Sequence, residues 1–369
     1  MNILVTGAKG FLGKNLISTL ENNFNYNVYQ YDVDCEPAVL DKYAAKCSFV
    51  FHLAGVNRPK DESEFIEGNV RFTEKLTESL KKNNNKSPIL VSSSIQAALD
   101  NPYGKSKKAS EQIISRYSEA TGAPAYIYRI TNVFGKWCRP NYNSVIATFC
   151  HNIARDLPIT INDPQTEMNL VYIDDVITEF VNAIEGVVSY NGEFCTVKPI
   201  HTMKLGDIAS LIKSFHDSRK TIQVPNLSDK FTKKLYSTYL SYLPHDKFSY
   251  PLKMNIDSRG SFTEFIRTPE RGQLSVNVSR AGIVKGNHWH HTKNEKFLVV
   301  SGEGIIRFRQ VDSDDILEYR VNGKDHLVLD IPPGYTHNIE NTGRVDMVTV
   351  MWANECFDPE NPDTFMLEV

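Results

Sequence analysis

The stretch of residues 3–13 limits the folds open to this chain more than any other part of its sequence. A short apolar run is followed by three glycines spaced G-x-x-G-x-x-G, and then by an amphipathic run typical of a helix. The first glycine permits a tight turn, the second lets backbone approach a pyrophosphate, and the third lets the helix pack closely on the strand. Glycine triplets are common in turns, but a strand before this one and a helix after it predict a dinucleotide-binding site. Its expected contact residues are Gly7, Lys9, Gly10, Phe11, Leu12 and Gly13.

The composition narrows the class of protein. A length of 369 residues favours more than one domain. The net charge of −3 offers no basic surface for nucleic acid or an anionic membrane, and no apolar run is long enough to span a bilayer. The first strand begins at once, without a signal peptide, and the six cysteines are scattered with no C-x-x-C pair. We therefore expect a cytoplasmic protein with reduced thiols and with neither a nucleic-acid nor a membrane partner.

Two further segments extend the predicted nucleotide site. Asp32 follows a predicted strand at residues 27–31. An acidic residue about 20 positions beyond the glycine loop usually binds a ribose hydroxyl, which favours NAD over NADP, although Asp32 could simply begin a loop. Residues 48–55 read as a strand buried on both faces that ends in a turn of small residues, so Leu53 and Ala54 are expected beside the cofactor. His52 is expected to be a hydrogen-bonded wall residue of this site.

A third strand, residues 89–91, runs into three serines that end at Ser94. Tyr103 and Lys107 follow with the spacing Y-x-x-x-K, which places both on one face of a helix. A lysine ammonium there can lower the phenol pKa and hold a nicotinamide ribose, so that the tyrosine exchanges a proton with a carbonyl oxygen while hydride moves. The spacing alone is common in surface helices, but its place after the serines and the glycine loop favours a reductase site.

These motifs together resemble the extended short-chain dehydrogenases/reductases that act on nucleotide sugars. The resemblance covers residues 1–245 and implies an α/β Rossmann fold with a doubly wound parallel sheet that binds NAD(P). It also implies that Ser94 orients the substrate oxygen and that Arg129 and Asn132 belong to the nucleotide-sugar site. The loop from the serines to the tyrosine is shorter than usual, and it lacks the acidic pair of the family's sugar dehydratases. Reduction of a 4-keto group therefore fits this chain better than dehydration.

Beyond residue 250 the pattern changes to short strands separated by Gly, Asn and Asp turns, which predicts an all-β sandwich or barrel. His288 and His290 share one face of a strand, and with Glu295 and His337 they make a set of metal-ligand types. The spacings resemble both sequence motifs of the cupin barrel, which implies a metal-binding cupin domain at residues 246–369. Residue types alone leave Zn, Mn, Fe and Ni open. A metal-free cupin that uses the same side chains as a polar pocket is the alternative.

Residues 257–262 and 285–288 also resemble deoxysugar 3,5-epimerases, which are cupins that use the equivalent histidine as a base and need no metal. His288 is therefore predicted either as a metal ligand or as a catalytic base. In the second case His290, Glu295 and His337 keep the metal, with an open coordination position.

The order of the two halves resembles the CapF-like fusions of capsular polysaccharide synthesis. The resemblance implies that the cupin epimerises C3 of a UDP-2-acetamido-2,6-dideoxy-hexos-4-ulose. Reduction of C4 would then yield UDP-2-acetamido-2,6-dideoxy-β-L-talose, a precursor of UDP-N-acetyl-L-fucosamine. It further implies Zn2+ and a homodimer. In a rival interpretation only the reductase is catalytic, and the cupin is a dimerisation or sugar-binding module. A third interpretation is a non-enzymatic dinucleotide sensor. The intact set of Ser94, Tyr103 and Lys107 argues against it.

The same resemblance implies NADPH, which conflicts with the NAD preference indicated by Asp32. We follow the family here, and expect Asp32 to turn away from the nucleotide and Lys9 to face the 2′-phosphate. NADH remains the alternative cofactor.

Overall fold

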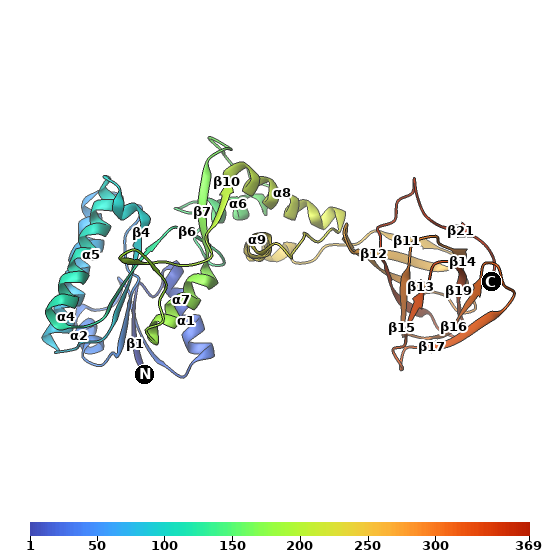
Figure 1. The fold of residues 1–369 in the computed structure, drawn as a ribbon, viewed down its shortest axis with the longest axis horizontal. Coiled ribbons are helices and arrows are strands. Elements are labelled where there is room, and N and C mark those ends of the chain that lie inside the picture. The colour runs from blue at the N-terminus through green and yellow to red at the C-terminus, as the bar shows by residue number, and fades with distance from the viewer. The chain divides into compact units, whose positions relative to one another are not determined.

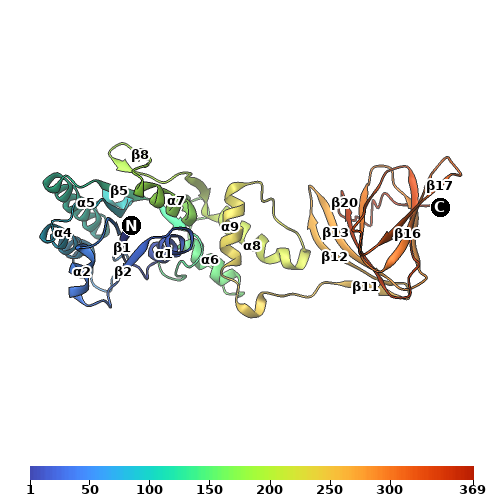
Figure 2. The same ribbon diagram turned by 90° about the horizontal axis from the view of Figure 1, so that it is seen from below.

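The computed structural model of the protein describes residues 1–369, which form two compact units (Figure 1, Figure 2). The first unit comprises residues 1–213 and 233–244, and the second comprises residues 214–232 and 245–369. None of the helices combines the length and the apolar character that a membrane crossing needs.

The first unit is built on a seven-stranded sheet. Its strands are β1 (Asn2–Thr6), β2 (Asn27–Tyr31), β3 (Phe49–His52), β4 (Ile89–Ser94), β5 (Ala125–Ile130), β8 (Tyr190–Asn191) and β9 (Phe194–Cys195). They lie in the order β2-β1-β3-β4-β5-β9-β8, and every neighbouring pair is parallel except β8 and β9. The order reverses at β1, which lies between β2 and β3, so a ligand crevice is expected at the carboxyl ends of these strands.

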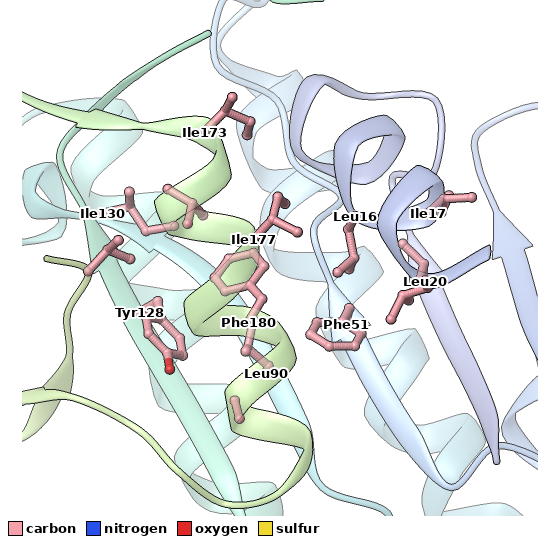
Figure 3. Packing of buried hydrophobic residues seen from close by; sticks show 14 of the residues in the cluster. Leu16, Ile17, Leu20, Phe51, Leu90, Tyr128, Ile130, Ile173, Ile177 and Phe180 are labelled. Carbon is pink, nitrogen blue, oxygen red and sulfur yellow. The ribbon is translucent and has the colours of Figure 1, made fainter. Parts of the chain in front are cut away.

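Helices cover both faces of this sheet, which explains why its central strands are almost wholly apolar. On one face, α1 (Phe11–Asn23) and α7 (Ile173–Ile184) bury a shared cluster, in which Leu16 and Phe180 lie beside Phe51 of the sheet (Figure 3). The other face is covered by α2 (Pro37–Ala44), α4 (Phe72–Lys82) and α5 (Pro102–Thr121). The predicted doubly wound parallel sheet is confirmed.

The segment before α4 contains a π-helical turn, Ile66–Arg71, which follows α3 (Ser63–Phe65). The side chain of Asn69 in this turn is buried, and its oxygen accepts the backbone N–H of Val56 at 2.7 Å. Its nitrogen donates to the hydroxyl of Ser106 at 2.9 Å. Such turns occur frequently at functional sites. Here the turn ties the loop after β3 to helix α5.

The first unit also contains a smaller sheet and the helix α6 (Val145–Ile153), with a 3-10 turn at Ile95–Ala98. The sheet has the order β10-β7-β6 and consists of β6 (Asn132–Phe134), β7 (Glu167–Tyr172) and β10 (His201–Lys204). The residues of α8 (Leu205–Thr221) and α9 (Lys230–Leu240) are divided between the two units, and a 3-10 turn at His245–Lys247 belongs to the second.

The second unit consists of two antiparallel sheets, so the predicted all-β domain is confirmed. The six-stranded sheet has the order β11-β12-β13-β20-β15-β18, and the five-stranded sheet has the order β17-β16-β19-β14-β21. The strands are β11 (Met254–Asp257), β12 (Gly260–Thr268), β13 (Gly272–Ser279), β14 (Val284–Trp289), β15 (Glu295–Ser301), β16 (Glu303–Gln310), β17 (Ile316–Asn322), β18 (Val328–Ile331), β19 (Tyr335–Asn341), β20 (Met347–Ala353) and β21 (Phe365–Met366). Their buried side chains, such as Phe297 of one sheet and Ile306 of the other, form one apolar core.

A short stretch of residues 214–232 also belongs to this second unit. The backbone N–H of Val224 donates to the carbonyl of Arg267 at 2.9 Å, and that of Arg267 donates to the carbonyl of Ile222 at 2.8 Å. The stretch therefore extends the pairing of β12 beyond the end of β11.

Candidate active site

A pocket of about 1490 Å³ lies in the first unit at the carboxyl ends of its parallel strands. This is the crevice where the strand order reverses and where ligands of such sheets bind. The predicted site residues that line it are Gly7, Lys9, Gly10, Phe11, Leu12, Gly13, Leu53, Ser94, Tyr103, Lys107 and Asn132. The predicted residues Asp32, Ala54 and Arg129 do not line it.

The glycine loop joins β1 to α1 with no room for side chains. Gly7 has a φ of +68°, and a Cβ atom there would lie 2.7 Å from the backbone nitrogen of Ala54. A Cβ atom on Gly13 would lie 2.2 Å from the carbonyl oxygen of Gly7. Ala54 thus supports the loop from behind, and α1 directs its free backbone N–H groups at the pocket, as a pyrophosphate requires.

Ser94 and Tyr103 meet in the pocket. Ser94 ends β4, and Tyr103 lies in the first turn of α5, where the side chain of Asn101 caps the helix by accepting the N–H of Gly104 at 2.7 Å. Burial raises the pKa of Tyr103, and hydrogen bonds with the side chains of Asn57 and Ser94 partly offset that rise. The phenol is therefore protonated at neutral pH and placed to donate. Sequence reasoning missed Asn57, whose one signal is its place just after the β3 turn.

Lys107 lies one turn further along α5 and is buried. Its ammonium donates to the carbonyl of Ser92 at 2.9 Å and lies close to Gly55, where an added Cβ would be 3.2 Å away. Burial lowers the pKa of Lys107 to about 8, although Glu111 opposes the shift. The lowering of the phenol pKa by the lysine stays a prediction, as does its contact with a ribose hydroxyl.

The lowered pKa of Lys107 predicts a pH dependence of nucleotide binding. Below pH 8 the ammonium is charged and binds the anionic dinucleotide, and above pH 8 that charge is lost. We expect the dissociation constant of the reduced cofactor, measured by fluorescence titration, to rise as the pH increases through this value. Lys107→Met should remove the inflection and weaken binding at low pH. Lys105→Met is the control, because Lys105 is exposed on the same helix and its pKa is raised by Asp100; an inflection lost in that variant instead would exclude Lys107 as its source.

His52 is the hydrogen-bonded wall residue that we expected. Its Nδ1 lies 2.8 Å from the hydroxyl of Thr6, and its Nε2 lies 2.8 Å from the hydroxyl of Thr73. Burial lowers the pKa of His52 to about 3, so the ring stays neutral. It joins β1, β3 and α4 beneath the pocket and takes no part in proton transfer.

Asp32 faces the glycine loop. Its Oδ2 accepts the backbone N–H of Lys9 at 2.7 Å, and its Oδ1 accepts that of Val33 at 2.8 Å. The ammonium of Lys9 forms an ion pair with Asp34. In this structure Asp32 thus does not turn away from the glycine loop, and the ammonium of Lys9 that we expected at a 2′-phosphate is paired with Asp34. Both carboxylates lie just after β2, where the adenosine ribose of a dinucleotide is expected.

Arg129 is held away from the pocket. Its guanidinium donates two hydrogen bonds to Glu111, at 3.0 and 2.7 Å, and lies over the ring of Phe194, 3.5 Å from its centroid. Glu111 is buried and also accepts a hydrogen bond from Ser93. The structure therefore corrects the substrate contact implied for Arg129, since its side chain joins β4, β5 and α5 instead.

Replacing Arg129 with Leu is expected to destabilise the first unit by about 3–5 kcal/mol, because it leaves the Glu111 carboxylate buried and unpaired. The dissociation constant of the sugar nucleotide should stay the same at temperatures where the variant is folded. Urea unfolding and substrate titration measure the two effects. Arg116→Leu, at an exposed position of α5, the helix that carries Glu111, is the control. Weaker substrate binding at unchanged stability would restore the substrate role of Arg129.

The opposite wall of the pocket comes from β6 and the loop after it. Asn132 lines the pocket, and its amide donates to the carbonyl of Asn169 at 3.2 Å. Trp137 has a positive φ of 68° and is 52% exposed, and the guanidinium of Arg139 lies 5.1 Å from the ring centroid of Tyr142. Exposed aromatic planes and a cation suit the base and diphosphate of a nucleotide. Sequence reasoning missed this loop, because single aromatic and basic residues carry no spacing signal.

The second unit brings four potential metal ligands together. His288 comes from β14, His290 from the loop after it, Glu295 from the start of β15 and His337 from β19. Their ligand atoms all lie within 4.8 Å of one another. His288 and His337 are register partners across β14 and β19.

The donor atoms of this cluster fit a bound cation. Nε2 of His290, Oε2 of Glu295 and both ring nitrogens of His337 are buried and have no hydrogen-bond partner. The carboxylate oxygen lies 3.5 Å from Nε2 of His290 and 3.4 Å from Nε2 of His337, longer than an ordinary hydrogen bond. Unpaired buried polar atoms are costly, and two imidazoles with a carboxylate are a common set for a divalent metal.

Asp363 holds this cluster from outside, and sequence reasoning missed it. Its carbonyl lies 2.5 Å from Nδ1 of His290, which directs Nε2 of that ring at the cluster. Its carboxylate accepts the backbone N–H groups of residues 291–293. Next to it, Phe365 of β21 pairs with Trp289 of β14. No motif identifies Asp363, because its role depends on a contact with residues about 70 positions earlier in the chain.

Comparisons with known proteins show which families the two parts of this chain resemble. Residues 3–193 match the model of the NAD dependent epimerase/dehydratase family, and residues 255–365 match that of the Polysaccharide biosynthesis C-terminal domain. The chain is 44% identical over 369 residues to a UDP-2-acetamido-2,6-beta-L-arabino-hexul-4-ose reductase of Pseudomonas aeruginosa, covering 100% of this chain and 99% of that protein.

Solved structures agree with this placement. The crystal structure of the capsular polysaccharide assembling protein CapF from Staphylococcus aureus matches with a TM-score of 0.95 and 54% identity, over 100% of both chains. A UDP-glucuronic acid 4-epimerase from Bacillus cereus, solved with NAD, shares the fold over 66% of this chain and 99% of its own, with a TM-score of 0.56 and 20% identity. With a family model over its first half and such identity along its whole length, this chain belongs to the NAD dependent epimerase/dehydratase family, in the group that contains CapF.

Proposed function

We propose that the chain is a bifunctional enzyme that inverts C3 of a UDP-2-acetamido-2,6-dideoxy-hexos-4-ulose and then reduces its C4 carbonyl. The product is UDP-2-acetamido-2,6-dideoxy-β-L-talose, on the route to UDP-N-acetyl-L-fucosamine. The observation that carries the proposal is the placing of Ser94, Tyr103 and Lys107 in one pocket with the glycine loop. The name of the Pseudomonas aeruginosa relative, a hexul-4-ose reductase, supports the same substrate class.

In the reductase site, Tyr103 donates its phenolic proton to the substrate O4 as the carbonyl is reduced. The Oγ of Ser94 accepts the backbone N–H of Gln96 at 3.2 Å, and its hydroxyl, which is hydrogen-bonded to Tyr103, can turn its proton to the same substrate oxygen. Lys107 holds the ribose of the cofactor. A bound reduced nicotinamide supplies the hydride for C4. The resemblance to the family implies NADPH, with NADH as the alternative.

We propose that the second unit is a cupin and the site of C3 epimerisation. His290, Glu295 and His337 would hold a divalent cation such as zinc, which supplies Lewis-acid stabilisation of charge on O4. His288 is half-buried while His290 and His337 are fully buried, so it is the imidazole most open to a substrate. His288 is our candidate base for the C3 proton, and in the absence of substrate it completes the ligand set.

The order of the two reactions follows from the chemistry of the sugar. The C3 proton is acidic only while C4 is a carbonyl, because the carbanion delocalises onto O4. Reduction of C4 removes that acidity and fixes the stereochemistry at C3. Epimerisation must therefore precede reduction.

The test is NMR of the UDP-linked 4-keto-6-deoxy sugar incubated with the protein in D2O, first without and then with reduced cofactor. Deuterium at C3 before cofactor is added, followed by reduction of C4, supports both activities. Reduction without exchange leaves the reductase and demotes the second unit to a dimerisation or sugar-binding module. If neither deuterium exchange at C3 nor reduction of C4 is observed, the proposal as a whole is wrong.

Two further points belong to the proposal. The six cysteines are free thiols, as in proteins of the reducing cytoplasm, where we place the enzyme. The resemblance to the CapF group also leads us to propose a homodimer, which sedimentation velocity would test.

A further inference from the structure

We propose that Asp32, Val33 and Asp34 make the nucleotide site of the first unit selective for NADH over NADPH. The inference rests on the proposed reductase function and names its hydride donor. It runs against the cofactor implied by the family resemblance, and it depends on residues of this chain alone.

The first step is the position of Asp32. Backbone N–H groups on either side, those of Lys9 in the glycine loop and of Val33, hold its two oxygens at 2.7 and 2.8 Å. A carboxylate oxygen has two acceptor positions, so one position on each oxygen remains for the neighbouring hydroxyls of an adenosine ribose. The contact to Lys9 fixes the carboxylate beside the loop that binds the pyrophosphate. Asp32 is thus placed as an acceptor for the ribose 2′-hydroxyl, which NADPH lacks.

The second step is the charge that a 2′-phosphate would meet. Lys9 is the cation of the glycine loop, its backbone N–H donates to Asp32, and its ammonium is paired with Asp34. Asp32, Asp34 and Lys9 together leave one net negative charge. Val33 between the two carboxylates is 99% exposed and uncharged, at the end of β2 where a nearby arginine would serve a phosphate.

The other cations of the pocket come from different elements. Lys14 belongs to α1, Arg58 to the loop after β3, Lys107 to α5 and Arg139 to the loop after β6. These positions suit the pyrophosphate, the ribose and the sugar nucleotide. The loop after β2 contributes no cation of its own, because residues 32–36 are Asp, Val, Asp, Cys and Glu.

Isothermal titration of the full chain with NADH and with NADPH measures the preference without any sugar substrate. We expect NADH to bind more tightly by about tenfold or more, because the 2′-phosphate of NADPH would lie beside carboxylates of like charge. The same ratio should appear in kcat/KM for the two cofactors. Equal binding, or tighter binding of NADPH, would overturn the inference.

Variants assign the preference to residues. Asp32→Asn should weaken NADH and strengthen NADPH, and the double change D32N/V33R should reverse the preference. Asp34→Asn should free Lys9 and strengthen NADPH alone. Asp61→Asn, at an exposed position of another loop, removes the same charge and should leave the ratio unchanged. A ratio that moves equally in all variants would show a general charge effect and contradict the assignment.

The outcome also separates this inference from the function on which it rests. A protein that prefers NADH but does not reduce the keto sugar keeps the inference and loses the proposed function. A protein that reduces the sugar with NADPH at least as well as with NADH keeps the proposed function and overturns this inference.

Discussion

Replacing Tyr103 with Phe is expected to lower C4 reduction by about 10²–10⁴-fold, because the transition state loses its general acid. The variant keeps the ring and removes only the hydroxyl, so the fold and the binding of the reduced cofactor should persist. Exchange at C3 should continue at the wild-type rate, since it belongs to the second unit. Cofactor oxidation at 340 nm and NMR in D2O measure the two activities on one sample.

Tyr26→Phe is the matched control. Tyr26 precedes β2 at the amino-terminal edge of the sheet, away from the pocket, and its ring stacks on Phe24. It should retain full reductase activity. Loss of both activities in Tyr103→Phe would show that one site performs both steps, contrary to the proposed division.

Replacing His290 with Ala is expected to empty the proposed metal site. Loss of a residue that is hydrogen-bonded to a metal ligand weakens metal binding by about 10–100-fold, and loss of a ligand itself should weaken metal binding more. Epimerisation should fall with metal content. A metal that binds the folded state alone adds about 4 kcal/mol of stability at 1,000 times its dissociation constant, so the unfolding temperature should also fall. Elemental analysis, C3 exchange and calorimetry measure these effects.

Two further variants serve as the control and as a second test of the ligand assignment. His291→Ala removes an exposed imidazole that packs on Trp289 and Phe365 and is not one of the four clustered ligands, so the metal content of this variant should equal that of the wild type. Glu295→Gln removes a ligand charge with almost no change in volume, so it separates metal loss from a packing defect. Unchanged metal in both His290→Ala and Glu295→Gln would mean that the ligand assignment is wrong.

The parts of the site that could be predicted are those that depend on local geometry. The glycine triplet and the pair Tyr103 and Lys107 have fixed spacings that a strand-turn-helix imposes, so the sequence located them. The failures concern charge partners. Nothing near Arg129 in the sequence indicates Glu111, and nothing near Lys9 indicates Asp34, because both pairs form between segments that only the sheet brings together.

In the fold, too, the features that could be predicted are local in sequence, and those that could not are contacts between distant segments. Apolar strands and amphipathic helices of the first unit show in the sequence because their period is local. The π turn around Asn69 does not, since it is stabilised by contacts to Val56 and Ser106 on other elements. In the second unit the sequence predicts the short strands, but the contact of Asp363 with the histidine cluster forms only in the folded β domain.

The pairing of β13 with β20 has a consequence for how the chain matures on the ribosome. The residues that line the pocket of the first unit end at Leu170, and those of the core cluster packed on its sheet end at Val197, so this site can take shape while the second unit is still being synthesised. In the second unit Gln273 pairs with Ala353 and Trp289 pairs with Phe365, so these strand pairings form only after the later residue of each pair has been synthesised. Pairings between distant residues form slowly, and an unpaired strand edge invites aggregation until they do. We therefore expect the nascent chain to pass through a stage in which the first unit is largely folded and the sheets of the second unit still have unpaired edges.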